Sequence, residues 1–182
     1  MPDNMLVGLN ADLRKALVES PDSASVTVLN AINEPVVRTA FSADYIALQT
    51  SEAGTMQLKL LPLVNNTDIV AVITTVCGDA CDSSIDFYTT TWQALPSENM
   101  FPPKQKEWFI SASADRNSDD FKNAVVALDM TPIKLTFAPD NTTITAVYDL
   151  KNYLADEEYK LIEPFLFKES RTLRWDKLSF KE

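Results

Sequence analysis

Two cysteines separated by three residues are the first candidates for chemistry in this chain. The run Cys77-Gly78-Asp79-Ala80-Cys81 lies between two apolar stretches, which predicts a three-residue hairpin loop with a cysteine at each strand end. Facing residues there reach the roughly 4.4–6.8 Å Cα separation of a disulfide, so a disulfide and two unlinked thiols both fit. A metal or redox site fits poorly, because two thiolates without histidine leave a tetrahedral site half empty and C-x-x-x-C is not the redox spacing.

Acidic clusters are the second group of candidates, and each has a plainer structural interpretation. Asp115-Arg116-Asn117-Ser118-Asp119 begins like a calcium loop, but Asp120 replaces the turn glycine and Val126 replaces the bidentate glutamate. On a helix, Asp156-Glu157-Glu158 would fan out by about 100° per residue and would not face one substrate. We interpret the acids around the cysteine hairpin as turn and surface residues: Asp79, Asp82 and Asp86. The sequence therefore predicts no metal, no cofactor and no catalytic residue.

Aromatic residues are the third group, because exposed rings form contact surfaces for sugars or proteins. Tyr88 falls on the outward phase of a predicted strand, and Trp92 follows it in a threonine-rich stretch. With Trp108 they make a candidate binding surface, although such rings more often pack beneath a neighbouring element. Asn65-Asn66-Thr67 and Asn141-Thr142-Thr143 match the N-x-T acceptor pattern, which is common by chance and matters only in a eukaryotic secretory context.

The composition of the 182 residues excludes several classes of function. Histidine is absent and the three glycines are scattered, which excludes Ser-His-Asp triads, His-containing zinc sites and phosphate-binding glycine loops. The net charge of −10 disfavours nucleic acid and anionic lipid. We expect a protein that is not an enzyme, since histidine is the usual base near neutral pH. Met1-Pro2-Asp3-Asn4 does not begin a signal peptide, and no apolar run is long enough to span a bilayer.

Hydrophobic patterning predicts runs of strands joined by short turns rather than strands alternating with helices. The predicted strands are 25–29, 36–41, 45–49, 55–61, 69–76, 83–89, 108–111, 133–137, 143–148 and 173–180, the last with a bulge at 176–177. The predicted helices are 3–19, capped by Asp3 or Asn4 and ended by Ser20-Pro21, a second through Phe121 and Leu128 capped by Ser118, and 151–163. We expect an α+β fold dominated by antiparallel sheet with a few packed helices. It would form one domain over 1–182, with a boundary between two lobes near 96–103.

Two of these strands have different predicted environments. In 55–61, Met56, Leu58 and Leu60 alternate with Gln57 and Lys59, which predicts one buried face and one solvated face. The strand 69–76 is almost wholly apolar and β-branched, which predicts a place in the sheet interior with both faces covered.

Several stretches also resemble a known family over essentially the whole chain. They are Met1-Pro2-Asp3, 44–49, 51–62, 84–88 with Thr91-Trp92, Met130-Thr131-Pro132 and Leu173-Arg174-Trp175, of which 51–62 is the most specific. In this order they resemble the domain of unknown function 3256 family of Bacteroidales bacteria. The resemblance implies an exported protein of the periplasm or cell envelope, with no established activity and no functional residue to carry over. Cys77 and Cys81 are not part of it, but an oxidising periplasm would oxidise a close pair.

Three functions are compatible with the sequence. The leading hypothesis is a non-catalytic cell-envelope module that binds a protein or glycan partner through an exposed aromatic patch. A carboxylate-dependent hydrolase would need convergent acids with raised pKa values in a cleft. A periplasmic carrier of a small apolar ligand would need an enclosed apolar pocket of roughly 300–1,000 Å³.

Overall fold

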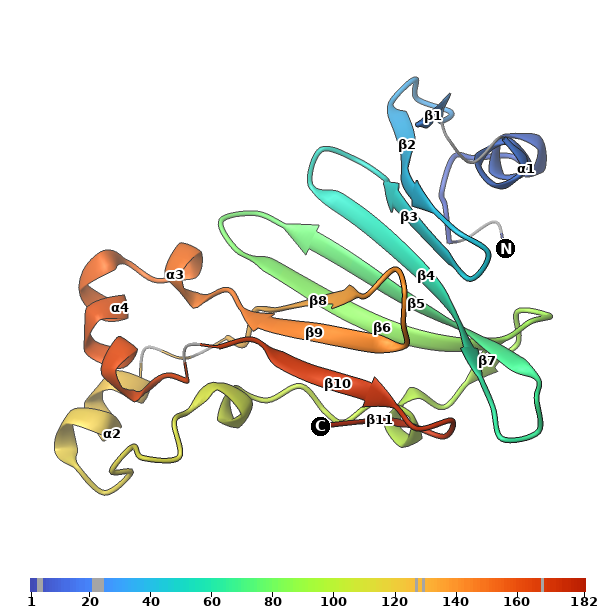
Figure 1. The fold of residues 1–182 in the computed structure, drawn as a ribbon. Coiled ribbons are helices and arrows are strands. Elements are labelled where there is room, and N and C mark those ends of the chain that lie inside the picture. Colours follow the sequence, from blue (N-terminus) through green and yellow to red (C-terminus); the bar gives the residue numbers. More distant parts are fainter. Residues whose placement is uncertain (3–4, 21–24, 127, 129, 168) are drawn as a thin grey trace.

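Seven strands in chain order form the larger of two antiparallel sheets in the computed structural model, which describes residues 1–2, 5–20, 25–126, 128, 130–167 and 169–182 (Figure 1). These strands are β1 (Val26–Leu29), β2 (Pro35–Phe41), β3 (Tyr45–Gln49), β4 (Gly54–Pro62), β5 (Asp68–Cys77), β6 (Cys81–Thr89) and β7 (Ala94–Leu95). The smaller sheet has the order β11-β10-β9-β8, built from β8 (Ile133–Phe137), β9 (Thr143–Tyr148), β10 (Arg171–Trp175) and β11 (Phe180–Lys181). The expected α+β class with antiparallel pairing is confirmed.

The α-helices lie at two opposite ends of the molecule (Figure 1). Helix α1 (Ala11–Glu19) packs beside β1 and β2, whereas α2 (Asp119–Val125), α3 (Leu150–Tyr153) and α4 (Asp156–Ile162) gather at the far end. Three short 3₁₀ helices complete the elements: η1 (Ser97–Asn99), η2 (Lys106–Phe109) and η3 (Glu163–Phe165). The far-end helices bury their own apolar cluster, which includes Phe121, Leu150 and Ile162.

The first helix begins later than predicted. It starts at Ala11, and the Asn10 side chain caps it by accepting a hydrogen bond from the Leu13 amide at 2.9 Å. Gly8 has a φ of +82° and its carbonyl accepts from the Ala31 amide, so no helix passes through Gly8. The predicted caps Asp3 and Asn4 and the helix-ending Pro21 lie outside the described residues.

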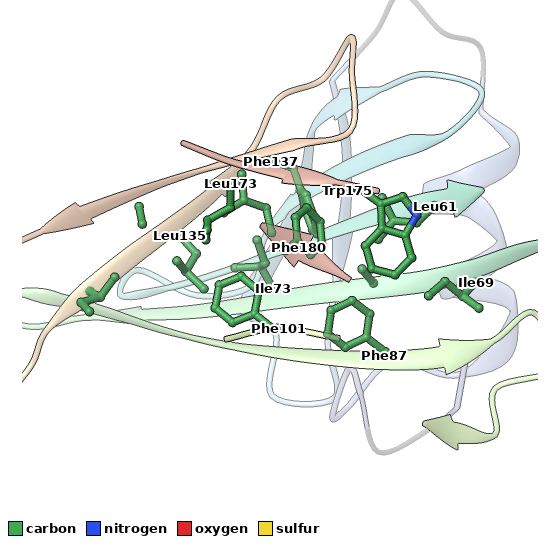
Figure 2. Close-up of a cluster of buried hydrophobic side chains, with 14 of the residues drawn as sticks. Leu61, Ile69, Ile73, Phe87, Phe101, Leu135, Phe137, Leu173, Trp175 and Phe180 are labelled. Carbon is green, nitrogen blue, oxygen red and sulfur yellow. The ribbon is translucent and has the colours of Figure 1, made fainter. Parts of the chain in front are cut away.

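The main core lies between the two sheets, and Figure 2 shows its side chains. Ile69, Ile73 and Phe87 of the larger sheet face Leu135 and Trp175 of the smaller one, and all five are buried. A second cluster covers the other face of the larger sheet with residues of α1 and the N-terminal segment, among them Leu6, Leu9 and Leu17. Strand β5 pairs with β4 and β6, so its predicted place in the sheet interior is confirmed.

Strand β4 corrects the prediction of a solvated face. Met56 and Leu58 are buried on one face, as expected, whereas Leu60 on that face is only half-buried. Gln57 and Lys59 on the other face are 8% and 1% exposed. The smaller sheet covers them. The Gln57 Oε1 accepts from the Phe137 amide at 3.0 Å, and Lys59 Nζ donates to the Pro139 carbonyl at 2.8 Å. The polar residues of this alternating strand are therefore buried because they form hydrogen bonds with the backbone of the β8–β9 hairpin.

The same arrangement continues along the open edge of β8. Its alternate amides at Ile133, Leu135 and Phe137 point away from β9, toward the larger sheet. Asp82 Oδ1 accepts from the Ile133 amide at 3.0 Å, and Ser83 Oγ accepts from the Leu135 amide at 2.9 Å. An unpaired strand edge is a liability that these side chains remove.

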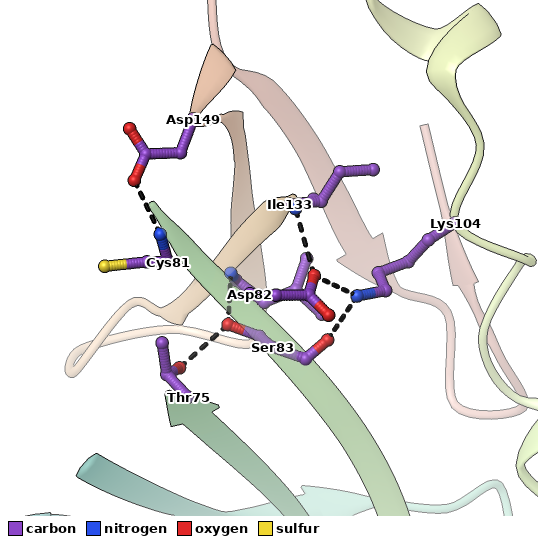
Figure 3. A network of polar contacts seen from close by, with 8 residues as sticks. Thr75, Cys81, Asp82, Ser83, Lys104, Ile133 and Asp149 are labelled. Atoms are coloured by element: carbon purple, nitrogen blue, oxygen red, sulfur yellow. Dashed lines mark hydrogen bonds and ion pairs between the residues drawn. The ribbon is translucent and has the colours of Figure 1, made fainter. Parts of the chain in front are cut away.

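We call the polar side chains that receive β8 the seam. It consists of Gln57, Lys59, Thr75, Asp82 and Ser83. Thr75 and Ser83 share a hydroxyl hydrogen bond of 2.8 Å, and Lys104 Nζ donates to Asp82 at 2.6 Å (Figure 3). No side-chain polar atom that is buried in the described residues lacks a hydrogen-bond partner. The seam is thus fully satisfied, which is the condition under which buried polar groups are tolerated.

Three further predicted elements differ from the structure. Residues 108–111 form the end of η2 and an isolated bridge from Ile110 to Leu166 instead of a strand. The helix predicted at 151–163 is divided into α3, α4 and η3, because Leu154 is extended and buries its side chain among the helices. The predicted strand 173–180 is a hairpin of β10 and β11. Its change of phase marks a turn with Lys177 at a φ of +76°, and not a bulge.

The other elements appear close to their predicted bounds. Ser118 caps α2 by accepting from the Phe121 amide at 3.2 Å, and β8 and β9 form the expected hairpin. The proline-rich segment 96–103 contains η1 and places Phe101 in the core between the sheets. A lobe boundary in this segment stays a prediction.

Candidate functional site

Two of the three candidate aromatic residues lie together at the surface, and the third does not. Trp108 is 8% exposed and belongs to the core between the sheets. Tyr88 and Trp92 are half-buried on the opposite face of the larger sheet, with ring centroids 5.9 Å apart. Tyr88 and Trp92 therefore remain a candidate contact surface, whereas Trp108 is a residue of the core between the sheets.

Trp92 occupies an unusual backbone position. It is the last residue of the three-residue loop 90–92, which is closed by a hydrogen bond from the Thr89 amide to the Gln93 carbonyl. The Trp92 amide donates to the Thr89 carbonyl at 2.9 Å, and its φ is +66°. The last residue of such a loop adopts the left-handed conformation that favours glycine. Asparagine, the usual alternative, takes it at Asn33 and Asn66. Holding a bulky side chain there costs about 1–2 kcal/mol, and strain of this kind is characteristic of functional positions.

The Trp92 ring stands beside a shallow apolar groove, which we call the Trp92 groove. Its floor is formed by Leu58, Leu60 and Val70, which are neighbours across β4 and β5. Its far wall is formed by Val18 at the end of α1 and by Phe41 with the following turn, residues 42–44. The volume is about 170 Å³, which is smaller than a usual small-molecule pocket of about 300–1,000 Å³.

A buried arginine fixes the far wall. Arg38 is 2% exposed, and its Nη1 donates to the Leu17 carbonyl at 2.8 Å, next to Val18. Its guanidinium also lies 4.6 Å from the centroid of the Phe41 ring. One side chain thus joins the end of α1 to β2, so both parts of this wall are positioned before any partner arrives.

The charges around the groove are of two kinds. Asp44 is paired with Lys59 at 2.9 Å. Its burial opposes ionisation, but hydrogen bonds from Lys59 and Ser42 and the Lys59 charge outweigh this and lower the pKa of Asp44. Asp68 and Asp86 lie on the groove face of β5 and β6, are exposed, and form no ion pair within the described residues.

Asp86 also acts on the neighbouring aromatic ring. Burial, together with the negative charge of Asp86, raises the pKa of Tyr88. Tyr88 is therefore a neutral hydrogen-bond donor at neutral pH, next to unpaired carboxylates. The groove presents an apolar floor with negative charge on its β5–β6 side.

The cysteines form a disulfide across the β5–β6 turn, with a Cα separation of 4.0 Å between Cys77 and Cys81. The Cys81 amide donates to Asp149 Oδ2 at 2.7 Å, which ties this turn to the residue before α3 (Figure 3). Of the three aspartates near this hairpin, Asp82 has a structural role in the seam, whereas Asp79 and Asp86 are exposed.

The acidic and N-x-T candidates act as local structure. Asp115 Oδ1 accepts from the Asn117 amide in the turn before α2, and Asp156-Glu157-Glu158 is exposed in the first turn of α4. Asn65 and Asn141 each accept from the amide and the hydroxyl of the threonine two residues later, at the tips of two hairpins. No group of three or more cysteine or acidic residues in the described part of the chain is placed to hold a metal ion.

Sequence reasoning missed most of the groove. Leu60 and Val70 were expected only as core residues, and Val18, Phe41 and Arg38 had no assigned role. The signal that would have found the floor is register. Leu60 pairs with Val70 and Val70 pairs with Tyr88, so one row of side chains leads from the groove floor to the candidate aromatic pair.

Comparison with known proteins gives a family and a fold. The family described as "Protein of unknown function (DUF3256)" matches residues 1–180. A solved structure, "Structure of a domain of an uncharacterized protein from Porphyromonas gingivalis W83", superimposes with a TM-score of 0.89 at 24% identity, covering 100% of this chain and 94% of that chain. Curated proteins yield no match. The similarity shows that the two chains share a fold.

Proposed function

The chain belongs to the DUF3256 family, whose function is unknown, and we propose that it is a non-catalytic module that docks a protein partner in the Trp92 groove. The observation that carries this proposal is Trp92 itself. Its bulky side chain occupies a turn position that favours glycine, and its half-buried ring borders an apolar floor. The ring packs against Tyr88 and the second cluster, which offsets the strain in part, and a partner that packs against the open side of the ring would offset it further.

The chemistry of the groove favours a protein segment over a glycan. Its lining is predominantly apolar, and its volume suits one or two aliphatic or aromatic side chains. Aromatic anchors that fill such a site supply most of the binding energy at protein interfaces. The unpaired carboxylates Asp68 and Asp86, together with the net charge of −10, complement a basic flank. The proposed partner therefore presents an apolar side chain next to lysine or arginine.

Two carboxylates, Asp176 and Asp44, have lowered pKa values, and both shifts support the non-catalytic part of the proposal. Hydrogen bonds from Lys181 and from the Ser179 and Leu178 amides lower the pKa of Asp176 to about 2, and the pKa of Asp44 is lowered as well. A general acid needs the opposite, a carboxyl whose pKa is raised toward the working pH. Both residues are held as paired anions and have structural roles.

The experiment is a binding assay with two matched peptide libraries. Each seven-residue peptide has Leu, Ile or Phe at its centre, with lysines on both sides in one library and glutamates in the other. We expect the lysine library to bind more tightly, and added salt to weaken its binding. Asp68→Asn combined with Asp86→Asn should remove most of the preference for lysine, while Val64→Ala, at an exposed residue of the β4–β5 turn, is the matched control.

Two results would refute the docking proposal. One is equal binding of the lysine and glutamate libraries. The other is tight binding of the lysine library to Trp92→Gly, since the proposal predicts at least a tenfold loss in that variant, or about 1.4 kcal/mol.

We also propose that the protein resides in the cell envelope or periplasm. The disulfide between Cys77 and Cys81 supports this, because structural disulfides persist in oxidising compartments. No helix in the described part of the chain is both long and apolar enough to cross a bilayer. Thiol titration of the denatured, unreduced protein from the native cells tests the proposal. We expect no free thiol, and two free thiols would contradict it.

A further inference from the structure

A second concave site lies where strand β9 extends beyond strand β10. The last pair between them is Ala146 with Arg171, but β9 continues to Tyr148. The chain before β10 leaves the sheet instead. The Phe167 amide donates to the Phe109 carbonyl at 2.8 Å, next to the bridge between Ile110 and Leu166. The smaller sheet therefore opens at this end, and we call the opening the β9 cleft.

The β9 cleft has the size of a ligand site. Its volume is about 380 Å³, within the usual range for small-molecule pockets of roughly 300–1,000 Å³. Its walls come from the end of β9, from α4 through Tyr159, and from the segment that carries Phe167. Backbone hydrogen bonds hold that segment against Phe109, so the opening exists without a ligand.

Aromatic rings form the carbon surface of the cleft. The buried Phe109 and the half-buried Tyr148 are in contact, with ring centroids 5.2 Å apart. Phe167 is 37% exposed, and the guanidinium of Arg171 lies 4.9 Å from its ring centroid. Arg171 is itself fixed, because its Nε donates to the Trp108 carbonyl at 2.6 Å. The exposed ring is thus positioned rather than loose.

Polar side chains at the rim supply donors and acceptors. They are Lys151, Tyr159, Glu169 and Ser170. Within the described residues, none of these four side chains has a hydrogen bond or an ion pair. Lys151 and Glu169 carry opposite charges, so the charge of the rim sums to zero. The cleft differs in this respect from the Trp92 groove, whose lining is mostly apolar.

We propose that the β9 cleft binds a short neutral oligosaccharide. A sugar ring has one apolar C–H face, which packs on aromatic rings such as those of Tyr159 and Phe167, and several hydroxyls, which bond to polar side chains. The rim carries no net charge to attract an ion, and the net charge of −10 disfavours an anionic ligand. A purely apolar ligand would leave the four rim side chains without partners. The site is separate from the Trp92 groove and does not depend on it.

The test is an array of neutral oligosaccharides that includes chitotriose and maltotriose, probed with the full chain and followed by calorimetry with the best binder. We expect Tyr159→Ala and Phe167→Ala each to weaken binding at least tenfold, or about 1.4 kcal/mol. Leu178→Ala, at a 61% exposed leucine in the β10–β11 turn, is the matched control and should bind normally.

Two rim variants guard against loss of folding in the aromatic variants. Lys151→Met and Glu169→Gln change exposed side chains, so the fold should be retained, and each should weaken binding several-fold. The proposal is overturned if no neutral oligosaccharide on the array binds. It is also overturned if binding occurs but is unchanged in Tyr159→Ala, Phe167→Ala and both rim variants.

Discussion

The seam and the Trp92 groove lie on opposite faces of the same strands and reverse the usual distribution of polar and apolar residues. In the seam, Gln57 and Lys59 are buried, although their alternation with leucines is typical of a solvated face. In the groove, Leu60 is only half-buried, although the same alternation places it on the core side. Both regions depart from the sequence pattern of β4, one toward burial and one toward exposure.

The two regions differ in whether their side chains find partners within the molecule. Every seam side chain has a partner in the molecule, and most of these partners belong to the open edge of β8 or to the turn after it. The groove has an apolar floor that is open at Leu60, a tryptophan in a strained position, and two unpaired carboxylates on β5 and β6. A region that the fold explains is structural, and one that it leaves unexplained points to a partner outside the chain.

The largest effect is expected from removing a seam acceptor. Gln57→Leu keeps the side-chain size but leaves the Phe137 amide and the Tyr45 hydroxyl without their acceptor. Each buried orphan costs about 1–3 kcal/mol, so we expect a loss of about 3 kcal/mol in the free energy of unfolding, measured by urea denaturation. Gln93→Leu, at an exposed glutamine, should change it by less than about 0.5 kcal/mol. Equal small effects for both variants would show that the seam is not structural.

The disulfide should contribute less than the seam. It closes a short loop next to Asp82, and loop-closure entropy for about five residues corresponds to about 2 kcal/mol. Cys77→Ser with Cys81→Ser should lower the free energy of unfolding by about this amount and leave peptide binding in the Trp92 groove unchanged. Urea denaturation with and without a reductant gives the same comparison in the native sequence. A loss of groove binding on reduction would contradict the separation of the two regions.

The smallest effect concerns pH and the ion pair that adjoins both regions. The folded-state pKa of Asp44 lies below its ordinary value, so its contribution is complete above about pH 4 and is lost as the pH falls through the folded-state pKa. Asp44 is about half exposed, which limits the contribution to less than about 1 kcal/mol. Wild type should therefore be slightly more stable than Asp44→Asn at pH 7, and the difference should vanish in acid. A difference that persists at the lowest pH would refute this assignment.

Local sequence patterns predicted most of the helices and strands, but they did not predict which faces of those elements are buried. Strands such as β3, β8 and β9 match their predicted bounds, because alternation and turn residues are local signals. The burial of Gln57 and Lys59 could not be predicted, since it depends on a hairpin some 80 residues later in the chain. The early helix failed at Gly8, whose left-handed backbone is fixed by a contact with Ala31.

The candidate site was predicted only in part for the same reason. Tyr88 was identified from strand phase and Trp92 from the threonine-rich stretch that follows, and both signals are local. Trp108 follows the other interpretation given for these rings, packing beneath a neighbouring element, because the contact between the two sheets buries it. The groove walls combine α1 with the β2–β3 turn through Arg38, and no spacing in the sequence indicates that contact.

The central claim is that Trp92 is retained for binding and not for folding, and one variant tests it most directly. Trp92→Gly relieves the left-handed strain while removing a half-buried ring, so the two effects of about 1–2 kcal/mol each should nearly cancel in stability. The measurement is the affinity of the purified variant for the best lysine-flanked peptide, alongside its urea denaturation curve. We predict a free energy of unfolding within about 1 kcal/mol of wild type and a binding loss of at least tenfold. Wild-type affinity in a variant that folds normally would contradict the account.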